Sequence, residues 1–299
     1  MKFSTKIKFF PFYVISLLPM FILNMLSDLV YVIAYHIIKY RRKVVRENLK
    51  NSFTDKSEQE IILIEKKFYK HFSDIVFEAV KSLTISKEEI KKRFSIKNLE
   101  LIEKYYTEGR SIILYTGHHG NWEWLIFLAL FIPYQTITFY QPLSNKYFNE
   151  LMKTIRERIG VICVESTKGY KTIISFKQQN ILTLTCLIGD QSPTKKATKH
   201  WVQFLNQNTA FLIGPDRIAN KSNQVVLFPA FEKSKRGHYT LDFKVIEEEP
   251  AKRNNYEIID KYAKLLEETI IKSPELWLWS HRRWKLKMSA TNENAIKYG

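Results

Sequence analysis

The stretch SIILYTGHHGNWEW, residues 111–124, decides how this chain folds. The apolar run at 112–115 predicts a buried strand, and a Thr-Gly pair ends it. The apolar run at 122–132 then predicts a helix, for which Asn121 is a suitable N-cap. A strand therefore ends, a tight turn follows and a helix begins, which places two imidazoles and the Glu123 carboxylate at one cleft.

The spacing with chemical meaning in this stretch is His118-x4-Glu123. A carboxylate in the first helical turn can hold one nitrogen of His118 and leave the other nitrogen free as a base. The alternative is a structural histidine beside a carboxylate that only complements the helix dipole. We expect the neighbouring His119 to be structural. The motif alone does not decide between these interpretations.

Composition limits the class of protein. The 299 residues are 45% hydrophobic and 14% aromatic, enough for a sizeable core in one large domain or two small ones. Lys and Arg total 47 against 30 acidic residues, a net charge of +17 that implies an anionic partner. The basic residues are dispersed and form no recognition motif, which argues against nucleic acid. Cys163 and Cys186 lie in apolar runs without metal-ligand spacing, so we expect reduced core cysteines and no metal.

The N-terminal segment 1–40 is expected to attach the chain to a membrane. Residues 9–27 carry no charge, and roughly 20 apolar residues suffice to span a bilayer. The segment lacks a small-residue cleavage site, so it is either an uncleaved anchor or a pair of helices lying in the interface. The basic run KYRRK at 39–43 favours a cytoplasmic location for the remainder of the chain. The alternative is an apolar helical subdomain packed on the core.

The rest of the chain divides into a basic helical segment at 41–94, an α/β core at 95–289 and a flexible tail at 290–299. Within the core, strands and helices alternate, which predicts a mixed, mostly parallel central sheet flanked by helices. Ligands in such sheets bind at the carboxyl ends of strands, and His118 and Asp190 both fall at such ends. The expected strands are 112–115, 136–140, 161–164, 181–188 and 225–231, and the expected helices are 99–106, 122–132, 145–159, 170–179 and 210–219.

Several motifs succeed one another along the chain: RRKVVRENL at 41–49, GHHGNWE at 117–123, QPL at 141–143 leading to RERIG at 156–160, GDQSP at 189–193 and PELWLWSHRRWK at 274–285. On these motifs the chain resembles the late lipid A biosynthesis acyltransferases, members of the wider lysophospholipid acyltransferase group. The resemblance extends from the apolar N-terminus to Lys285. One departure is Phe204-Leu205-Asn206, which stands where many members have Phe-Phe-Gly and leaves the acyl-chain or acceptor preference open.

The resemblance implies transfer of a fatty acyl group from a thioester to a hydroxyl of a lipid A precursor. In that chemistry His118 is the general base and Glu123 orients it. An oxyanion or a substrate phosphate would then be bound by further polar residues of the motifs. Those substrate-binding or oxyanion residues are Asn121, Arg156, Arg158, Asp190 and Gln191.

Two of these expectations are more specific. Asp190 is expected to hold the acceptor or to orient an arginine, and the run 281–283, His-Arg-Arg, to contact acceptor phosphates or to face the membrane. The aromatic-rich segments 122–131 and 209–213 would line an acyl tunnel or simply form core.

The resemblance also implies the partners and the location. The donor is an acyl carrier protein or coenzyme A thioester, which serves as co-substrate, and no further cofactor is expected. The acceptor is an anionic lipid, and the catalytic domain lies on the cytoplasmic side of the inner membrane. One alternative keeps this chemistry and changes the acceptor to another glycolipid, an aminolipid or a lysophospholipid. The remote alternative is a non-catalytic basic membrane-binding protein.

Overall fold

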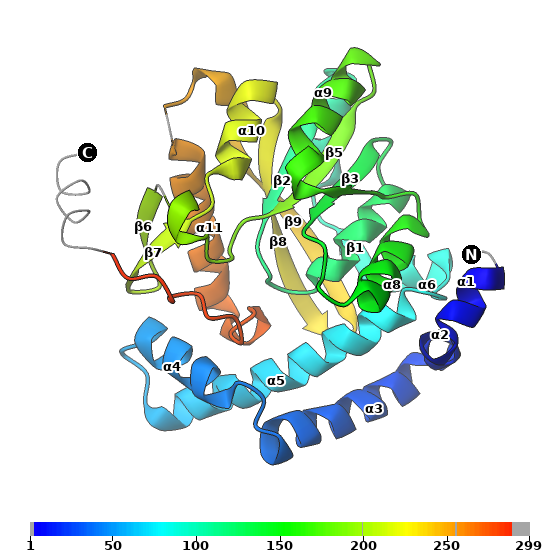
Figure 1. Cartoon of the computed structure of the whole chain (residues 1–299), viewed down its shortest axis with the longest axis vertical. Coiled ribbons are helices and arrows are strands. Elements are labelled where there is room, and N and C mark those ends of the chain that lie inside the picture. Colours follow the sequence, from blue (N-terminus) through cyan, green and yellow to red (C-terminus); the bar gives the residue numbers. More distant parts are fainter. Residues whose placement is uncertain (1–2, 199, 255, 289–299) are drawn as a thin grey trace.

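The computed structural model describes residues 3–198, 200–254 and 256–288 (Figure 1). Its centre is a seven-stranded sheet in the order β1-β9-β8-β2-β5-β3-β4, in which every pair is parallel except β8 with β9. The predicted mixed, mostly parallel sheet is therefore confirmed. The strands are β1 (Phe94–Ile96), β2 (Ile112–Thr116), β3 (Gln135–Tyr140), β4 (Ile162–Glu165), β5 (Thr183–Ile188), β8 (Val225–Lys235) and β9 (His238–Glu247).

Helices cover both faces of the sheet because the side chains of β2 alternate between two core clusters. Ile112 and Leu114 pack in one cluster, and Ile113 and Tyr115 pack in the other. The helices are α1 (Phe3–Lys8), α2 (Phe10–Leu17), α3 (Met20–Val32), α4 (Arg42–Ser52), α5 (Glu58–Lys81), α6 (Lys87–Arg93), α7 (Leu99–Thr107), α8 (Lys146–Glu157), α9 (Gly169–Gln178), α10 (Gly214–Ser222) and α11 (Glu257–Lys272).

The register of β2 against β5 positions the polar centre. The two strands are parallel neighbours, paired from Ile112 with Leu184 to Thr116 with Ile188. Both strands therefore end at the same edge, where the chain continues into Gly117-His118 and Gly189-Asp190.

The N-terminal helices lie along the long helix α5 (Figure 1). Helix α3 continues into a π-helical turn, Ile33–Ile37, and together they form one helix long and apolar enough to cross a membrane. Its inward face is tied to the domain, since Ser27 Oγ donates to Asp74 Oδ1 at 2.7 Å and Arg236 Nη1 contacts Asp28 Oδ2 at 2.9 Å. The expected apolar N-terminal helices are therefore present, and they pack on α5.

Two expected elements differ in the structure. Residues 122–132 form a 3₁₀ helix, Trp122–Leu130, instead of an α-helix. The segment 210–219, expected as a helix, is the end of strand β7 (Gln207–Phe211) followed by α10. Strand β7 pairs with β6 (His200–Phe204) through a turn at Leu205-Asn206, where both residues have positive φ angles of 50° and 60°.

That turn explains the missed hairpin. A two-residue turn of this kind is signalled in sequences by Asn-Gly or Asp-Gly, and Leu-Asn gives no such signal. Strands β1, β6 and β9 were also not predicted from the sequence. The predicted tail, 290–299, lies outside the described residues.

Candidate active site

The His118 imidazole is held by Asp190, not by Glu123 as the local spacing predicted. His118 Nδ1 lies 2.7 Å from Asp190 Oδ1, and the His118 backbone N–H donates to Asp190 Oδ2 at 2.7 Å. The Trp277 indole N–H donates to the same Oδ2 at 2.8 Å. The adjacent ends of β2 and β5 make this pairing possible. Among the described residues the side-chain partners of Asp190 are therefore His118 and Trp277, and the expected arginine is not one of them.

The close approach of the two loops requires small residues. An added Cβ at Gly189 would lie 2.1 Å from the Tyr115 ring, and one at Gly117 would lie 2.9 Å from Leu266. Glycine therefore lets the His118 and Asp190 loops meet over Tyr115.

Electrostatics fix the state of the pair. Burial alone raises the pKa of Asp190, but the charge and hydrogen bonds of His118 and the bond from Trp277 outweigh it and lower this pKa to about 2. Asp190 is therefore a carboxylate, which accepts the Nδ1 proton of His118. The Nε2 atom of His118 is then the nitrogen without a proton, and it can accept one. The amide nitrogen of Gln191, Nε2, lies 3.4 Å from Nε2 of His118.

Glu123 pairs with Arg156. Arg156 Nη2 lies 2.9 Å and 3.1 Å from the two carboxylate oxygens of Glu123, and Arg156 Nε lies 3.3 Å from Oε2. The charge of Glu123, opposed in part by burial, raises the pKa of Arg156. Both residues border the same cleft as His118. The Glu123 carboxylate therefore contacts Arg156 and not the His118 imidazole. The first turn of the 3₁₀ helix directs the Glu123 side chain toward α8.

Two of the predicted substrate-binding residues have structural partners instead. The Asn121 amide donates to Glu78 Oε2 at 2.6 Å, and its oxygen caps the following helix by accepting the Trp124 N–H at 3.2 Å. Arg158 donates to the carbonyl oxygens of Ser82 and Ile85. Neither side chain is among those that border the cleft, so the structure does not place them at the imidazole.

The sequence matches the family model for the bacterial lipid A biosynthesis acyltransferase over residues 5–286, nearly the whole chain. The chain belongs to this family. It is accordingly an O-acyltransferase. A search of curated proteins gave no significant match. Among solved structures, the 1-acyl-sn-glycerophosphate acyltransferase of Thermotoga maritima is similar at a TM-score of 0.37 and 11% identity, covering 87% of this chain and 99% of that one.

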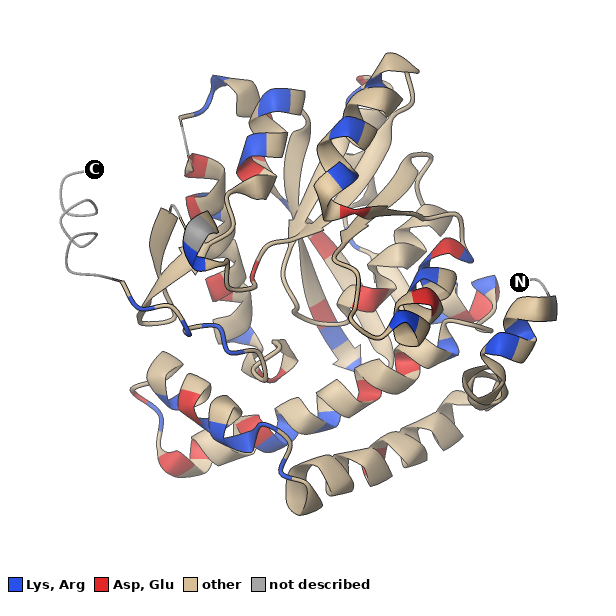
Figure 2. Ribbon diagram, viewed as in Figure 1, with Lys and Arg blue, Asp and Glu red and all other residues tan. Residues whose placement is uncertain are grey.

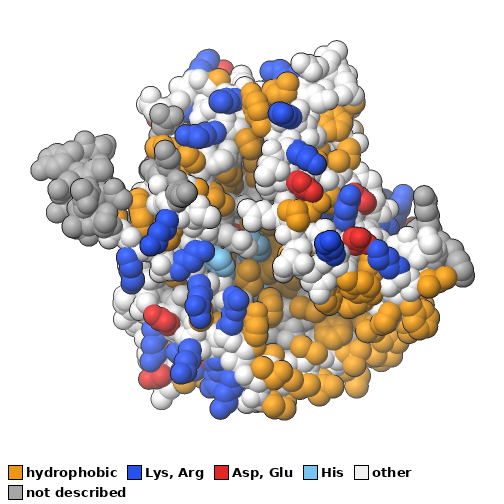
Figure 3. Space-filling model, in the orientation of Figure 1, with side chains coloured by type: hydrophobic (Ala, Val, Ile, Leu, Met, Phe, Trp, Pro, Cys, Tyr) orange, Lys and Arg blue, Asp and Glu red, His pale blue; other side chains and the backbone are white. Residues whose placement is uncertain are grey.

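A cleft of about 590 Å³ opens beside the acyltransferase's His118. Figure 3 shows histidine side chains within the central hollow of this face. The cleft extends between β3, β5, α8 and the 3₁₀ helix, and its inner wall is apolar. That wall includes Leu125, Ile126, Met152, Val161, Cys163 and Cys186. An acyl chain fits a cavity of this size and character.

The two cysteines in this wall are free thiols. Burial raises the pKa of Cys163 to about 11 and that of Cys186 to about 12. Both are therefore protonated at neutral pH and are poor nucleophiles. In the described ranges, no group of three or more His, Cys, Asp or Glu side chains is arranged to hold a metal ion.

Two further histidines, His119 and His71, form hydrogen bonds next to the site. His119 is buried, its Nε2 lies 3.1 Å from the Ser273 carbonyl oxygen, and burial lowers its pKa to about 4, as expected for a structural residue. His71, on α5, was not singled out from the sequence. Its Nε2 lies 3.2 Å from the Gly120 carbonyl oxygen and its Nδ1 lies 3.2 Å from Lys233 Nζ. It therefore connects α5 to the turn at Gly120, two residues after His118.

The three side chains of the His-Arg-Arg run at 281–283 lie in three different environments. His281 Nε2 accepts the Ser192 N–H at 3.2 Å, beside the Asp190 loop. Arg282 is exposed. Arg283 is buried over the Phe211 ring at 4.6 Å, so it does not face the membrane.

Proposed function

We propose that this acyltransferase moves a fatty acyl group from an acyl thioester to a hydroxyl of a lipid A precursor, with His118 as the general base. The observation that carries the proposal is the buried Asp190 carboxylate on His118 Nδ1, which leaves Nε2 directed to an apolar-walled cleft. A hydroxyl is a poor nucleophile until a base removes its proton.

The reaction then needs one base and no enzyme nucleophile. The acceptor hydroxyl transfers its proton to His118 Nε2 as its oxygen attacks the thioester carbonyl carbon. The tetrahedral oxyanion collapses, the C–S bond breaks, and the imidazolium returns the proton to the leaving thiolate. Asp190 stabilises the imidazolium between these steps, as the carboxylate of a Ser-His-Asp triad does.

Arg156, held in place by Glu123, is the group that would stabilise the oxyanion. Arg156 Nη1 has no hydrogen-bond partner among the described residues, and the guanidinium is held at the cleft by Glu123. A fixed positive group near the developing negative charge lowers the barrier without reorganisation during the reaction. Glu123 is in this scheme a positioning residue for Arg156, and Gln191 contributes an amide next to His118 Nε2.

We further propose an acyl carrier protein as the donor, because an acidic partner suits a chain with a net charge of +17. The exposed apolar side chains of α1 to α3 support attachment to a membrane. The Asp28 and Ser27 contacts hold α3 against the domain, which favours helices lying in the cytoplasmic surface of the inner membrane over a helix that leaves the domain to cross it.

The test is mass spectrometry of lipid A and total polar lipids from cells with and without the protein. We expect loss of one acyl chain from lipid A, restored by the wild type and not by His118→Ala, with a fall in turnover of about two orders of magnitude or more. Unchanged lipid A alongside a missing minor lipid would move the acceptor to another glycolipid, aminolipid or lysophospholipid. Full activity in a folded His118→Ala protein would rule out this base.

A further inference from the structure

A second hollow, of about 820 Å³, lies between the start of α4 and the segment that follows Trp279. Figure 3 shows Lys and Arg side chains gathered over α4, beside the central hollow that contains the histidines, and Figure 2 shows the same charges on the ribbon. We call it the basic hollow. Seven cationic side chains and one carboxylate line it: Lys39, Arg41, Arg42, Lys43, Arg46, Lys50, Arg282 and Glu47.

Part of this positive charge is left uncompensated. Arg42 and Arg46 pair with Glu65, and Lys50 pairs with Glu58. In contrast, Lys39, Lys43 and Arg282 are exposed and have no acidic partner within the described part of the chain. Side chains that repel one another in this way favour an anion between them.

The start of α4 adds to the positive potential. The helix begins after Arg41, no side chain caps it, and its first turn has no acidic residue. A helix N-terminus carries a partial positive charge and free N–H groups, so the three cations at 41–43 stand where anions are normally preferred. Lys39 and Arg41 also have positive φ angles, 53° and 50°, an unfavourable conformation that the surrounding contacts must maintain.

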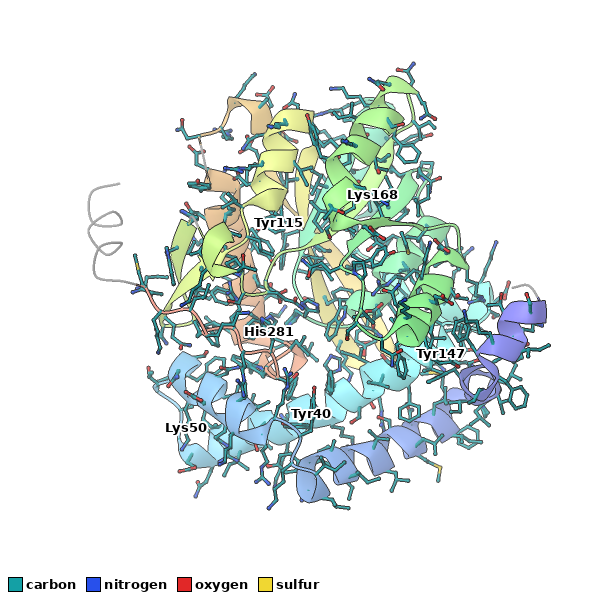
Figure 4. All side chains as sticks on the ribbon, viewed as in Figure 1. Tyr40, Lys50, Tyr115, Tyr147, Lys168 and His281 are labelled. Atoms are coloured by element: carbon teal, nitrogen blue, oxygen red, sulfur yellow. The ribbon has the colours of Figure 1, made fainter. Side chains whose placement is uncertain are left out.

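The basic hollow is connected directly to the active site. Arg282 follows His281, which binds the Ser192 N–H in the Asp190 loop. Arg41 Nη1 donates to the Ser280 carbonyl oxygen at 3.1 Å, and Asn48 Nδ2 donates to the carbonyl oxygens of Trp279 and His281 at 2.8 Å and 3.0 Å. In Figure 4, His281 lies just above α4, between the positions of Tyr40 and Lys50.

The segment that precedes the basic hollow in the chain is apolar. Ile37 and Ile38, just before Lys39, are 69% and 68% exposed and continue the exposed apolar side of α3. A lipid whose chains remain beside α3 would therefore bring its polar headgroup to the basic hollow and to the active-site loop together.

We propose that the basic hollow binds a phosphate group of the membrane-resident acceptor lipid. This rests on the proposed function in one respect, that the acceptor is a lipid. Arginine fork geometry and a helix N-terminus are the two most suitable partners for phosphate oxygens in proteins. A concave site of small-molecule size next to an apolar surface fits a lipid headgroup better than it fits the face of an acidic protein.

The test compares two variants that remove the same charge. Lys43→Gln/Arg282→Gln changes the basic hollow, and Lys168→Gln/Lys177→Gln changes exposed lysines near α9, far from it (Figure 4). Each is made in the His118→Ala background, so that binding is measured without turnover. The probe is a phosphatidylcholine vesicle containing a bisphosphorylated glucosamine-disaccharide lipid, and a second vesicle carries the same lipid without phosphates.

We expect the basic-hollow variant to bind the phosphorylated vesicle about tenfold or more weakly than its parent, while the α9 variant binds as the parent does. The difference should vanish on the vesicle without phosphates. Equal weakening in both variants, or weakening that persists without phosphate, would show a diffuse surface effect and overturn the proposal. A basic-hollow variant that loses only binding of an acyl carrier protein would overturn it too, in favour of a docking site.

Failure of the proposed function is distinguished from failure of this inference, because acyl transfer and phosphate-dependent binding are measured separately. Phosphate-dependent binding through the basic hollow in a protein that transfers no acyl group to this lipid would leave a lipid-phosphate site at the basic hollow and reject this lipid as the acceptor.

Discussion

The His118 imidazole depends on a carboxylate that is distant in sequence, so an amide at position 190 is the sharpest test of the pair. In Asp190→Asn the amide N–H₂ can donate to Nδ1, which places the imidazole proton on Nε2 and removes the base. We expect the rate constant kcat to fall by about 10² to 10⁴. Steady-state kinetics with a lipid acceptor and an acyl thioester measures this.

A matched control exists on the surface. His200 and Asp260 form a second His–carboxylate pair, 2.6 Å apart, which does not border the cleft. Asp260→Asn should leave kcat unchanged. An equal loss in both variants, or an active Asp190→Asn protein with unchanged thermal stability, would contradict the assigned role of Asp190.

At this scale the sequence correctly placed His118 and Asp190 at the ends of strands and predicted the wrong contact between side chains. His118 and Asp190 were both recognised as lying at carboxyl ends of strands, yet the short spacing to Glu123 suggested a local partner. The actual hydrogen bond joins residues 72 positions apart, and it depends on β2 and β5 being neighbours in the sheet. Strand order is a property of the folded chain that local spacing does not contain.

Among the elements, the turn between β2 and the 3₁₀ helix depends on a glycine for both its backbone conformation and its packing. Gly120 has φ +67°, and an added Cβ would lie 2.3 Å from Cβ of Phe231. Gly109 has nearly the same angle, φ +68°, with nothing within 4 Å of an added Cβ. A non-glycine residue would therefore be strained in its backbone at both positions, but only at position 120 would its Cβ also collide with a neighbour.

Alanine substitution at these two glycines separates strain from packing. Gly109→Ala should cost about 1–2 kcal/mol in the free energy of unfolding, the usual cost of a left-handed non-glycine residue. Gly120→Ala should cost about 1–3 kcal/mol more, because Phe231 must move, and should lower activity through the adjacent His118. Denaturant unfolding measures both. Equal costs would mean that Phe231 moves aside freely.

The same elements show what periodicity can and cannot predict. Strands β2, β3, β4, β5 and β8 all coincide with predicted apolar runs. The match is clearest for β2 and β5, because a buried parallel strand is a continuous apolar segment. Strand β9 was missed because its side chains alternate between core and solvent among charged residues, and β6 and β7 because an unusual turn joins them.

For the molecule as a whole, Glu78 links three parts of the fold. This buried α5 residue accepts hydrogen bonds from Asn121 in the active-site turn at 2.6 Å and from Tyr239 in β9 at 2.9 Å. Burial, and then the charge of Asp74, raise its pKa to about 7 from an ordinary value of 4.5. The native state therefore binds this proton more tightly than the unfolded chain does.

The sign of the pH dependence is set by this pKa. The contribution of Glu78 to stability is fully present below pH 4.5 and is lost as the pH rises through 7. In Glu78→Gln, which keeps a neutral group with the same acceptor oxygen, that contribution should no longer change with pH. We expect the wild type to lose stability relative to the variant between these pH values, measured as the difference in Tm. A constant difference would mean that Glu78 does not titrate there.

The N-terminal helices are the part of the molecule for which we propose contact with a membrane. On α3, Phe21, Met25 and Leu29 are 64%, 66% and 57% exposed, whereas Ser27 on its other side bonds to Asp74. A helix with one polar, domain-bound side and one apolar, exposed side suits the plane of a membrane surface. Under the proposed attachment, the exposed side is the one that would contact the membrane.

Two polar substitutions on that side test this orientation. Phe21→Ser/Leu29→Ser should weaken binding to lipid vesicles by about a hundredfold, since each buried side chain contributes about 1.5–3 kcal/mol. The Tm should stay close to that of the wild type, because neither side chain packs in the core. The control Val245→Ser/Ile271→Ser removes two similarly exposed apolar side chains elsewhere and should bind normally. If the Phe21/Leu29 variant bound vesicles as tightly as the wild type, this side of α3 would not be the membrane contact, and the approach of the lipid past Ile37 to the basic hollow would need another path.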